Sequence, residues 1–468
     1  MGRISRWLDA FGGRCRHDLR AWLCDPARIG GDAVGRHRLG SALDLTAPRL
    51  SSDARRVLVA QALRAFGYGF GAVLLGATLD QRGFTSTQVG LVLTAVVAGT
   101  VLASLGIGRF GDRLGRRRCY IGLYLALAVV GVVFSTASPL WALMLVALSG
   151  ALSTEVVESG PFTSLEQAML SSELEGHQRV RGFGIYNAVA TAAGALGALA
   201  AGLPDAVHRV WTDAPANERW FLLFVPVALA GAAVAASLSP DVEASDFANR
   251  KVAPPRATGL GPSKPTIVRL AGLFAMDSFG GGFVVQAFIA YWFTTRFGAS
   301  IGLLGVLFFA VGVLQTISFL CAPWLARRFG LLHTMVFTHL PSNVLLAAMA
   351  FAPTLEVAIA LLLARVVLSQ MDVPTRQAYV MALVEPDERT AAAAYTNTAR
   401  YIVRPLGPLL AGAASTIALG LPFLLAGGIK GTYDLILWRW FRTVPIPDES
   451  LQPTASTGAP TDVLDDSG

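Results

Sequence analysis

The sequence contains few charged residues for its length. Aspartate, glutamate, lysine and arginine make up 15% of its 468 residues, whereas hydrophobic residues make up 53%. A soluble protein of this size rarely has such a composition. Apolar runs of about 18 residues or more recur along the chain, and runs of this length can cross a bilayer. The shortage of charge therefore argues against a soluble protein and indicates a polytopic membrane protein.

Cysteine is also scarce, with four residues in the chain: Cys15, Cys24, Cys119 and Cys321. All four fall on predicted cytoplasmic segments or cytoplasmic helix ends, so we expect no disulfide framework. Cys15, His17 and Cys24 have no fourth ligand nearby, so we expect neither a metal site nor a cofactor. The chain has no H-E-x-x-H motif and no Walker loop. The second absence excludes a self-contained ATP-driven pump, and we do not expect an enzyme.

Acidic residues are fewer than basic ones, which gives the chain a net charge of +7. The bases cluster in loops beside the apolar runs, as in residues 109–118 and 250–264. There they would contact anionic lipids of the cytoplasmic leaflet, so we expect membrane lipids and not nucleic acid as partners. By the positive-inside rule, both termini lie in the cytoplasm. The predicted location is the cell membrane, inner or plasma.

The apolar runs predict an all-α protein with twelve membrane spans. We place them at 56–79, 89–108, 119–136, 139–168, 180–203, 219–238, 266–293, 301–322, 333–352, 354–378, 390–417 and 419–441. The corresponding domains are a basic cytoplasmic N-terminal extension (1–54), a six-helix bundle (55–238), a cytoplasmic linker (239–265), a second six-helix bundle (266–442) and a disordered cytoplasmic tail (443–468).

The most specific motif lies between the second and third spans, where residues 108–118 read G-R-F-G-D-R-L-G-R-R-R. About ten residues between two antiparallel spans predict a tight turn, in which the glycines tolerate positive φ. Asp112 is a lone acid among five arginines. The residues that we assign to this gating motif are Gly108, Gly111, Asp112, Arg113, Gly115 and Arg116.

This spacing resembles the loop signature of the major facilitator superfamily, a large family of secondary transporters. The resemblance implies two six-helix bundles related by a pseudo-two-fold axis and transport by alternating access. It also implies that Asp112 and its arginines latch the two halves in the outward-facing state. The N-terminus of span eleven, on the same side, would favour a docked carboxylate. We expect a monomer.

An internal repeat supports two related halves. Arg64-Ala-Phe-Gly-Tyr-Gly-Phe70 matches Asp277-Ser-Phe-Gly-Gly-Gly-Phe283, and Glu166-Gln-Ala168 matches Arg376-Gln-Ala378. Repeats in the same order and direction imply an axis along the membrane normal, with the transport path between the halves. Matched positions carry opposite charges, since Arg64 corresponds to Asp277 and Glu166 to Arg376.

Ionisable residues inside spans are costly and are functional-site candidates by default. We predict inter-half ion pairs between Arg64 and Asp277 and between Glu155 and Arg365. Arg64→Asp combined with Asp277→Arg should therefore recover the activity that either single change loses. Glu166 and Arg376 are expected to make gate or loop contacts, and Lys430 and Asp434 to neutralise each other. The predicted substrate and proton pathway comprises Arg64, Glu155, Glu158, Asp277, Arg365, Asp372, Asn397, Arg400 and Arg404.

The function predicted from these features is secondary transport of a small organic solute, coupled to protons. A carboxylate in a partly dehydrated cavity can take up and release protons near neutral pH, and the buried arginines favour an anionic or zwitterionic solute. One alternative is a drug/proton antiporter-type efflux pump, although span five has alanine where similar antiporters carry proline. Another is a transporter-like membrane sensor or lipid-handling protein.

Overall fold

The computed structural model describes residues 51–156, 160–173, 176–211, 213, 217–240, 242, 261–384 and 388–444. The chain divides into two compact units, Met1–Arg49 and Leu50–Gly468. The first unit lies outside the described residues, as do most of the predicted linker and nearly all of the predicted tail. The predictions of an N-terminal extension, a flexible linker and a disordered tail concern those segments.

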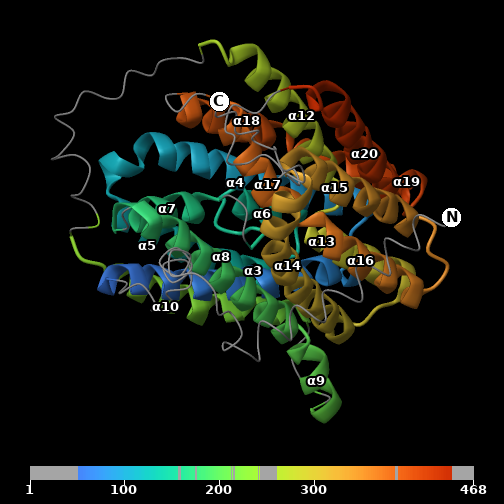
Figure 1. The fold of residues 1–468 in the computed structure, drawn as a ribbon. Helices are drawn as coiled ribbons and strands as arrows, with labels where there is room; N and C mark the ends of the chain where they lie inside the picture. The colour runs from blue at the N-terminus through green and yellow to red at the C-terminus, as the bar shows by residue number, and fades with distance from the viewer. Residues whose placement is uncertain are drawn as a thin grey trace, which may run out of the picture. The chain divides into compact units, whose positions relative to one another are not determined.

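Within the described residues every regular element is a helix (Figure 1). The first half contains α3 (Ser52–Gln81), α4 (Ser86–Leu114), α5 (Arg116–Thr136), α6 (Leu140–Ala147), α7 (Pro161–Glu173), α8 (Gly176–Ala200), α9 (Leu203–Val210), the 3₁₀ helix η1 (Asn217–Leu223) and α10 (Phe224–Ala236). The second half contains α12 (Lys264–Gly282), α13 (Gln286–Phe297), α14 (Ile301–Phe329), α15 (Leu331–Met349), α16 (Leu355–Ser369), α17 (Asp372–Ala382), α18 (Arg389–Val403), α19 (Leu406–Ile417) and α20 (Leu421–Phe441).

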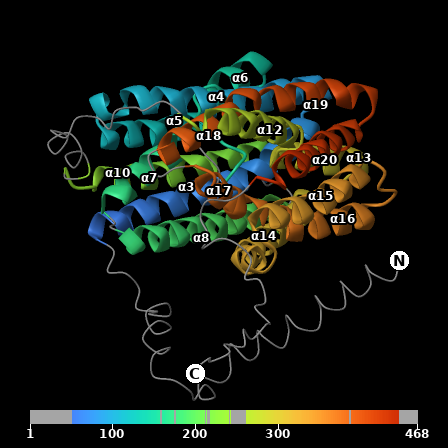
Figure 2. The same cartoon turned by 45° about the horizontal axis from the view of Figure 1, so that its top comes forward.

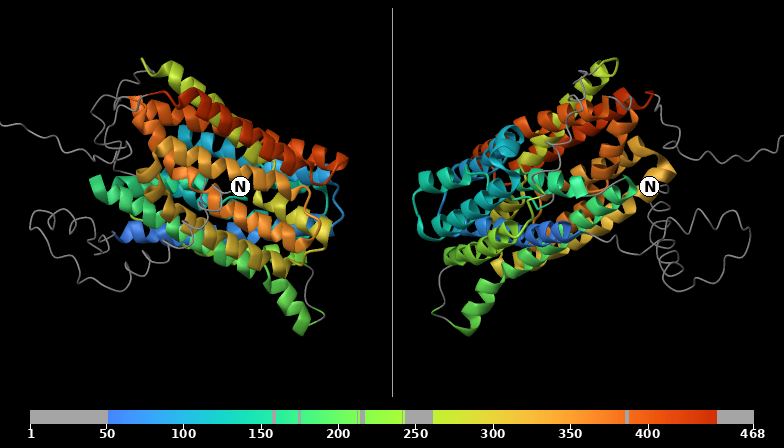
Figure 3. Two further views of the ribbon diagram at one scale, coloured as in Figure 1. Left: turned by 45° about the vertical axis from the view of Figure 1, so that its right-hand side comes forward. Right: turned by 90° about the vertical axis from the view of Figure 1, so that its left-hand side faces the viewer.

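The long helices lie side by side and run in alternating directions (Figures 2 and 3). In the first half, α3 packs against α8 and α10, and α5 packs against α10. The second half repeats this with α12 against α18 and α20, and α15 against α20. Three helix pairs make most of the contact between the halves: α4 with α19, α8 with α14, and α3 with α13. Smaller contacts join α3 and α9 to α14, and α4 to α13. The two halves therefore meet along a seam formed by the predicted spans 1, 2, 5, 7, 8 and 11.

Nine helical segments in the described part of the chain are long and apolar enough to cross a bilayer. The other three predicted spans also contain helices. Span four is split into α6 and α7, span eleven is split into α18 and α19, and α20 carries Lys430, Asp434 and Arg439 within its length. Pro405 explains the split in span eleven, because proline lacks the amide donor and clashes with the preceding turn. The count of twelve spans stays a prediction for these three.

The predicted ten-residue turn at 108–118 is wrong. α4 continues to Leu114 and α5 begins at Arg116, so Gly108 and Gly111 are helical and Gly115 alone connects the helices. Gly115 has a φ of 91°, which a residue with a side chain rarely adopts. Gly330, with a φ of 83°, joins α14 to α15 in the same way. The repeat thus extends to the backbone of this connection. The Asp112 side chain lies outside the described residues.

Candidate functional site

A cavity of about 240 Å³ lies mainly among helices of the second half. The first half contributes Thr154, Glu155 and Val156, from the non-helical segment between α6 and α7. Two breaks in second-half helices lie at this cavity: α12 ends at Gly282, just beyond Asp277, and α16 ends at Ser369, just before Asp372. Discontinuous helices beside a charged cavity are typical of substrate and ion sites in transporters. The ionisable residues that line the cavity are Glu155, Asp277, His339, Arg365, Asp372, Arg376, Arg400, Arg404 and Lys430.

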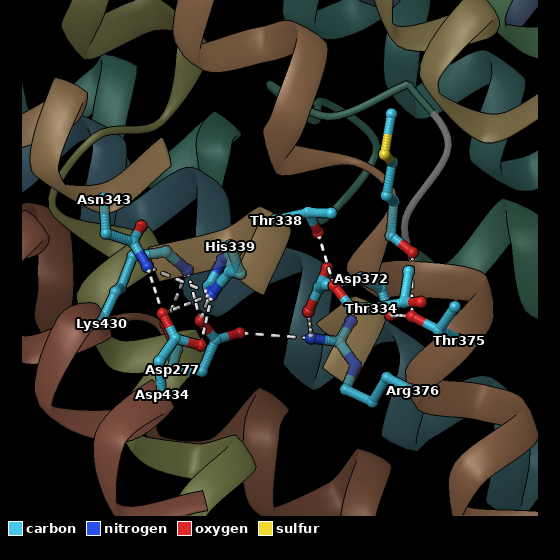
Figure 4. A network of polar contacts seen from close by, with 11 residues as sticks. Asp277, Thr334, Thr338, His339, Asn343, Asp372, Thr375, Arg376, Lys430 and Asp434 are labelled. Carbon is cyan, nitrogen blue, oxygen red and sulfur yellow. Dashed lines mark hydrogen bonds and ion pairs between the residues drawn. The ribbon is translucent and has the colours of Figure 1, made fainter. Parts of the chain in front are cut away.

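Asp277 belongs to a network of polar contacts at this cavity (Figure 4). Its side chain is 4% exposed. Lys430 Nζ donates to Asp277 Oδ1, and Arg376 Nη1 lies 3.3 Å from Asp277 Oδ2. The same Arg376 nitrogen donates to Asp372 Oδ2 at 3.1 Å. A carboxylate this deeply buried is costly unless it is paired, and α17 and α20 supply its cations.

His339 and Asn343 on α15 extend the network away from the cavity. His339 Nδ1 lies 2.9 Å from Asp434 Oδ1, and Asn343 Nδ2 donates to Asp434 Oδ2 at 2.8 Å. On the other side of the ring, His339 Nε2 lies 3.8 Å from Asp277 Oδ1. The histidine therefore connects two carboxylates that belong to α12 and α20 (Figure 4).

The first half contains the matching ion pair with its charges reversed. Arg64 on α3 donates to Glu166 on α7 through two nitrogens, at 3.0 and 2.8 Å. Tyr120 and Tyr186 donate to the two oxygens of the same carboxylate, at 2.9 and 2.7 Å. Arg64 is 1% exposed and Glu166 is 0% exposed. This pair is fully enclosed, and neither residue lines the cavity described above.

Several predicted contacts are corrected by these distances. Arg64 pairs with Glu166 and not with Asp277, so Glu166 and Arg376 complete buried pairs within their halves and are not loop contacts. The alignment of Arg64 with Asp277 still holds, because the two residues occupy equivalent positions. Arg64 on span 1 pairs with a residue of span 4, and Asp277 on span 7 pairs with a residue of span 10. The prediction was wrong in placing the two partners of each ion pair in opposite halves.

The predicted partners of Glu155 and Lys430 are also wrong. Glu155 accepts a hydrogen bond from Arg404 and not from Arg365, and this contact joins the two halves. Lys430 pairs with Asp277, while Asp434, one turn further along α20, pairs with His339. Residues at i and i+4 share a helix face, but here each has a partner on a different neighbouring helix.

The remaining predicted pathway residues are placed differently. Asp372, Arg400 and Arg404 line the cavity, and their role in a substrate and proton pathway stays a prediction. Asn397 is exposed and is not one of the residues that line it. Glu158 lies outside the described residues. Sequence reasoning missed His339 and Asn343, although their i, i+4 spacing in an apolar span was a usable signal.

The two halves are held together at one end of the bundle, which we call the sealed end. It comprises the ends of α3 and α13, the starts of α4 and α14, the region following α8, and the connections from α5 to α6 and from α15 to α16. Thr295 donates to Asp80 at 2.6 Å, and Ser86 and Tyr291 hydroxyls lie 3.0 Å apart. Asp205 Oδ2 accepts from the amide of Gly302, in the first turn of α14, at 2.7 Å. A carboxylate at a helix N-terminus is electrostatically favourable.

Removing the charge of Asp205 is expected to weaken the sealed end. Asp205→Asn keeps the shape of the side chain but loses the favourable interaction with the α14 N-terminus, worth about 0.3–1 kcal/mol. The population open at this end should rise by roughly 2- to 5-fold, measured by spin-label distances between Ser138→Cys and Phe351→Cys at that end. Asp213→Asn, at an exposed position beyond α9, is the control. An equal response of the two variants would contradict the latch.

The described part of the chain is therefore a helical membrane protein with two repeated halves and a charged cavity, which lies mainly in the second half and reaches the first at residues 154–156. This is the architecture of a secondary transporter. A sequence profile of the Major Facilitator Superfamily matches residues 57–408, and the chain belongs to this family.

Similar proteins agree with this assignment. The uncharacterized membrane protein YJR124C of Saccharomyces cerevisiae is 26% identical over 418 residues, covering 83% of this chain and 93% of that protein. Among solved structures, the nucleoside transporter NupG has a TM-score of 0.65 at 14% identity, covering 83% of this chain and 99% of its own. A D-xylose-proton symporter has a TM-score of 0.61 at 14% identity, covering 84% and 99%. At these identities the solved structures show a shared fold alone.

Proposed function

We propose that this protein transports a small organic solute bearing an anionic group, coupled to protons, by alternating access. The observation that supports the anionic group is Arg365 on α16. Its side chain faces the cavity, its buried Nε has no hydrogen-bond partner, and it forms no ion pair with any described residue. Arginine cannot be deprotonated in proteins, so a guanidinium in this position calls for an anion.

The shape of a guanidinium favours particular anions. Its planar set of donors matches carboxylate and phosphate oxygens, which it binds in pairs. Arg400 and Arg404 line the same cavity and add positive charge. The acids there, Glu155, Asp277 and Asp372, are in ion pairs with Arg404, Lys430 and Arg376, respectively. Among the described residues each acid at the cavity is therefore already paired with another cation, which leaves Arg365 available to a solute carboxylate or phosphate.

The arrangement of the halves supports one state of an alternating-access cycle. With both termini in the cytoplasm, as the basic loops favour, the sealed end faces outward and the conformation is inward-facing. Opening the outer side would separate Asp205 from α14 and Asp80 from Thr295. We propose that Asp112, at the opposite end of α4, then helps to hold the inner ends together, as the family resemblance implies.

A thermal-shift screen of the purified full-length protein tests the proposed solute. The probes are small carboxylates, organic phosphates, amino acids, neutral sugars and nucleosides, since a bound ligand stabilises the folded state in proportion to the logarithm of its concentration over Kd. We expect stabilisation by members of the anionic or zwitterionic classes. Stabilisation by neutral solutes alone would contradict the proposal.

Replacing Arg365 is expected to remove this binding. Arg365→Gln loses a charge-assisted hydrogen bond of about 1.5–3 kcal/mol, so Kd should rise roughly 10- to 100-fold. Arg365→Lys should also bind weakly, because an ammonium cannot reproduce the paired geometry. Arg328→Gln, at an exposed position near the end of α14, is the matched control and should bind normally. Unchanged affinity in Arg365→Gln would show that the anion binds elsewhere.

A further inference from the structure

The polar network behind the cavity contains one histidine, His339, held between two carboxylates. Its ring is 4% exposed and lies in the middle of α15, a helix predicted as span nine. α15 is not one of the helices that form the seam between the halves. Yet His339 lines the cavity together with Asp277 and Lys430, while Asp434 and Asn343 lie behind it. The network therefore leads from the cavity into the packed interior of the second half.

The charges that face His339 come from several neighbouring elements. The network consists of Asp277 on α12, Asp372 and Arg376 on α17, and Lys430 and Asp434 on α20. The Tyr433 ring packs edge-on to the imidazole at 6.0 Å, and Arg365 on α16 and Arg400 on α18 line the cavity near Asp277.

Within the hydrogen-bonded network, three carboxylates oppose two permanent cations. Arg365 and Arg400 add positive charge near Asp277 from the cavity side, whereas a proton on His339 adds positive charge between Asp277 and Asp434. An uncompensated buried charge is costly, so the occupancy of His339 by a proton and the arrangement of its neighbours are linked.

The hydrogen bonds define where a proton would bind. Nδ1 faces Asp434 Oδ1 at 2.9 Å, so the neutral ring directs its N–H to Asp434 and leaves the Nε2 lone pair toward Asp277 Oδ1, 3.8 Å away. Protonation adds a hydrogen at Nε2 and a second donor toward Asp277. Asp277 Oδ1 already accepts from Lys430, so the imidazolium competes with the ammonium for one oxygen. Because Asp277 lies on α12, close to its end at Gly282, a change in the partners of Asp277 would shift this part of the helix.

The first half shows what the same architecture looks like without such a group. Around the Arg64–Glu166 pair the additional donors are the hydroxyls of Tyr120 and Tyr186. One carboxylate opposes one guanidinium there, and a phenol of ordinary pKa titrates near pH 10, far from neutrality. The two halves share a buried pair, but among the described residues a histidine bridges two carboxylates only in the second.

We propose that His339 is the residue that binds the coupled proton, at Nε2, and that its protonation redistributes Lys430 and Arg376 around Asp277 to shift the equilibrium between the two access states. This deepens the proposed function, since it rests on proton coupling. It does not rest on the solute site at Arg365.

The test uses the full-length protein in lipid nanodiscs without solute. The native cysteines are replaced by serine, and spin labels at Ser138→Cys and Phe351→Cys, both exposed at the sealed end, report on its opening. Distances are compared between about pH 5.5 and 8, where an imidazole of ordinary pKa titrates. In the parent protein we expect the ratio of the two distance populations to change roughly tenfold over this range.

Two variants separate a proton site from a structural residue. His339→Gln should give the high-pH distribution at every pH. His339→Lys, whose ammonium would be kept charged by Asp277 and Asp434 on either side, should give the low-pH distribution. His333→Gln is the matched control: it lies on the same helix, is exposed and stacks on Phe337, and should respond as the parent does. A pH response retained by either His339 variant, or absent from the parent, would overturn the proposal. The pH response is measured without solute and the thermal-shift screen at one pH, so failure of the solute site and failure of the proton site are distinguishable.

Discussion

Replacing Arg64 with glutamine is expected to destabilise the folded protein by about 3–5 kcal/mol. The reason is that Glu166, with 0% exposure, would keep its charge without a cation. Two tyrosine hydroxyls would remain as donors, but neither carries a compensating charge. The loss is measured as the change in the free energy of unfolding in mixed micelles, or as the drop in thermal midpoint of the purified protein.

A matched control exists on the same helix. Arg56 pairs with Asp53 at 2.8 Å, the same N···O distance as between Arg64 and Glu166, but its side chain is 41% exposed. Water solvates the Arg56 guanidinium, and Asp53 would keep the hydrogen bonds that Ser239 donates to it, so Arg56→Gln should cost no more than about 1 kcal/mol. If both variants lost the same stability, burial would not be the cause of the Arg64 effect.

Removing both charges should cost less than removing one. In Arg64→Met combined with Glu166→Gln, no buried charge remains, and replacement of a buried ion pair by uncharged groups is often close to neutral. We therefore expect the double variant to recover most of the stability that Arg64→Gln loses. Recovery would identify the pair as a structural connection between α3 and α7. A double variant no more stable than Arg64→Gln would contradict this.

The sequence predicted which residues form these buried ion pairs but not which residue pairs with which. The repeat aligns Arg64 with Asp277 and Glu166 with Arg376, and the structure places all four in equivalent buried pairs. Because the charges are reversed between the halves, pairing within each half and pairing across the halves both give neutral combinations. Sequence spacing contains no distance between α3 and α12, so it could not choose between them.

Other features lay beyond the sequence for different reasons. Lys430 and Asp434 satisfy the spacing of a helical ion pair, but α12 and α15 bring competing partners that only tertiary packing reveals. His339 and Asn343 also lie one turn apart on α15. The apolar composition of that span did not predict that they belong to a polar network. The Gly108–Arg118 motif predicted the position of the hairpin correctly. The length of its turn was predicted wrongly, because α4 stays helical through Gly108 and Gly111 as far as Leu114.

Exchanging the charges of Arg64 and Asp277 is the variant that separates the two pairing schemes most strongly. If the residues faced each other across the halves, Arg64→Asp combined with Asp277→Arg would restore what either single change loses. In the structure, the new carboxylate would instead face Glu166, and the new guanidinium would face Lys430 and Arg376. Two buried clusters of like charge would result, so we expect the double variant to be worse than either single one.

The corresponding exchange within the first half gives the opposite expectation. Arg64→Glu combined with Glu166→Arg keeps one acid and one base in the enclosed site and should retain folded protein. Folded yield and thermal midpoint measure both exchanges, and spin-label distances at the sealed end report whether the folded variants still change state. The cross-half exchange should lower the yield of folded protein by roughly tenfold or more, since a loss of several kcal/mol is comparable with the whole stability of a protein. Rescue by the cross-half exchange, with none by the within-half exchange, would show that Arg64 and Asp277 meet in the state that governs stability.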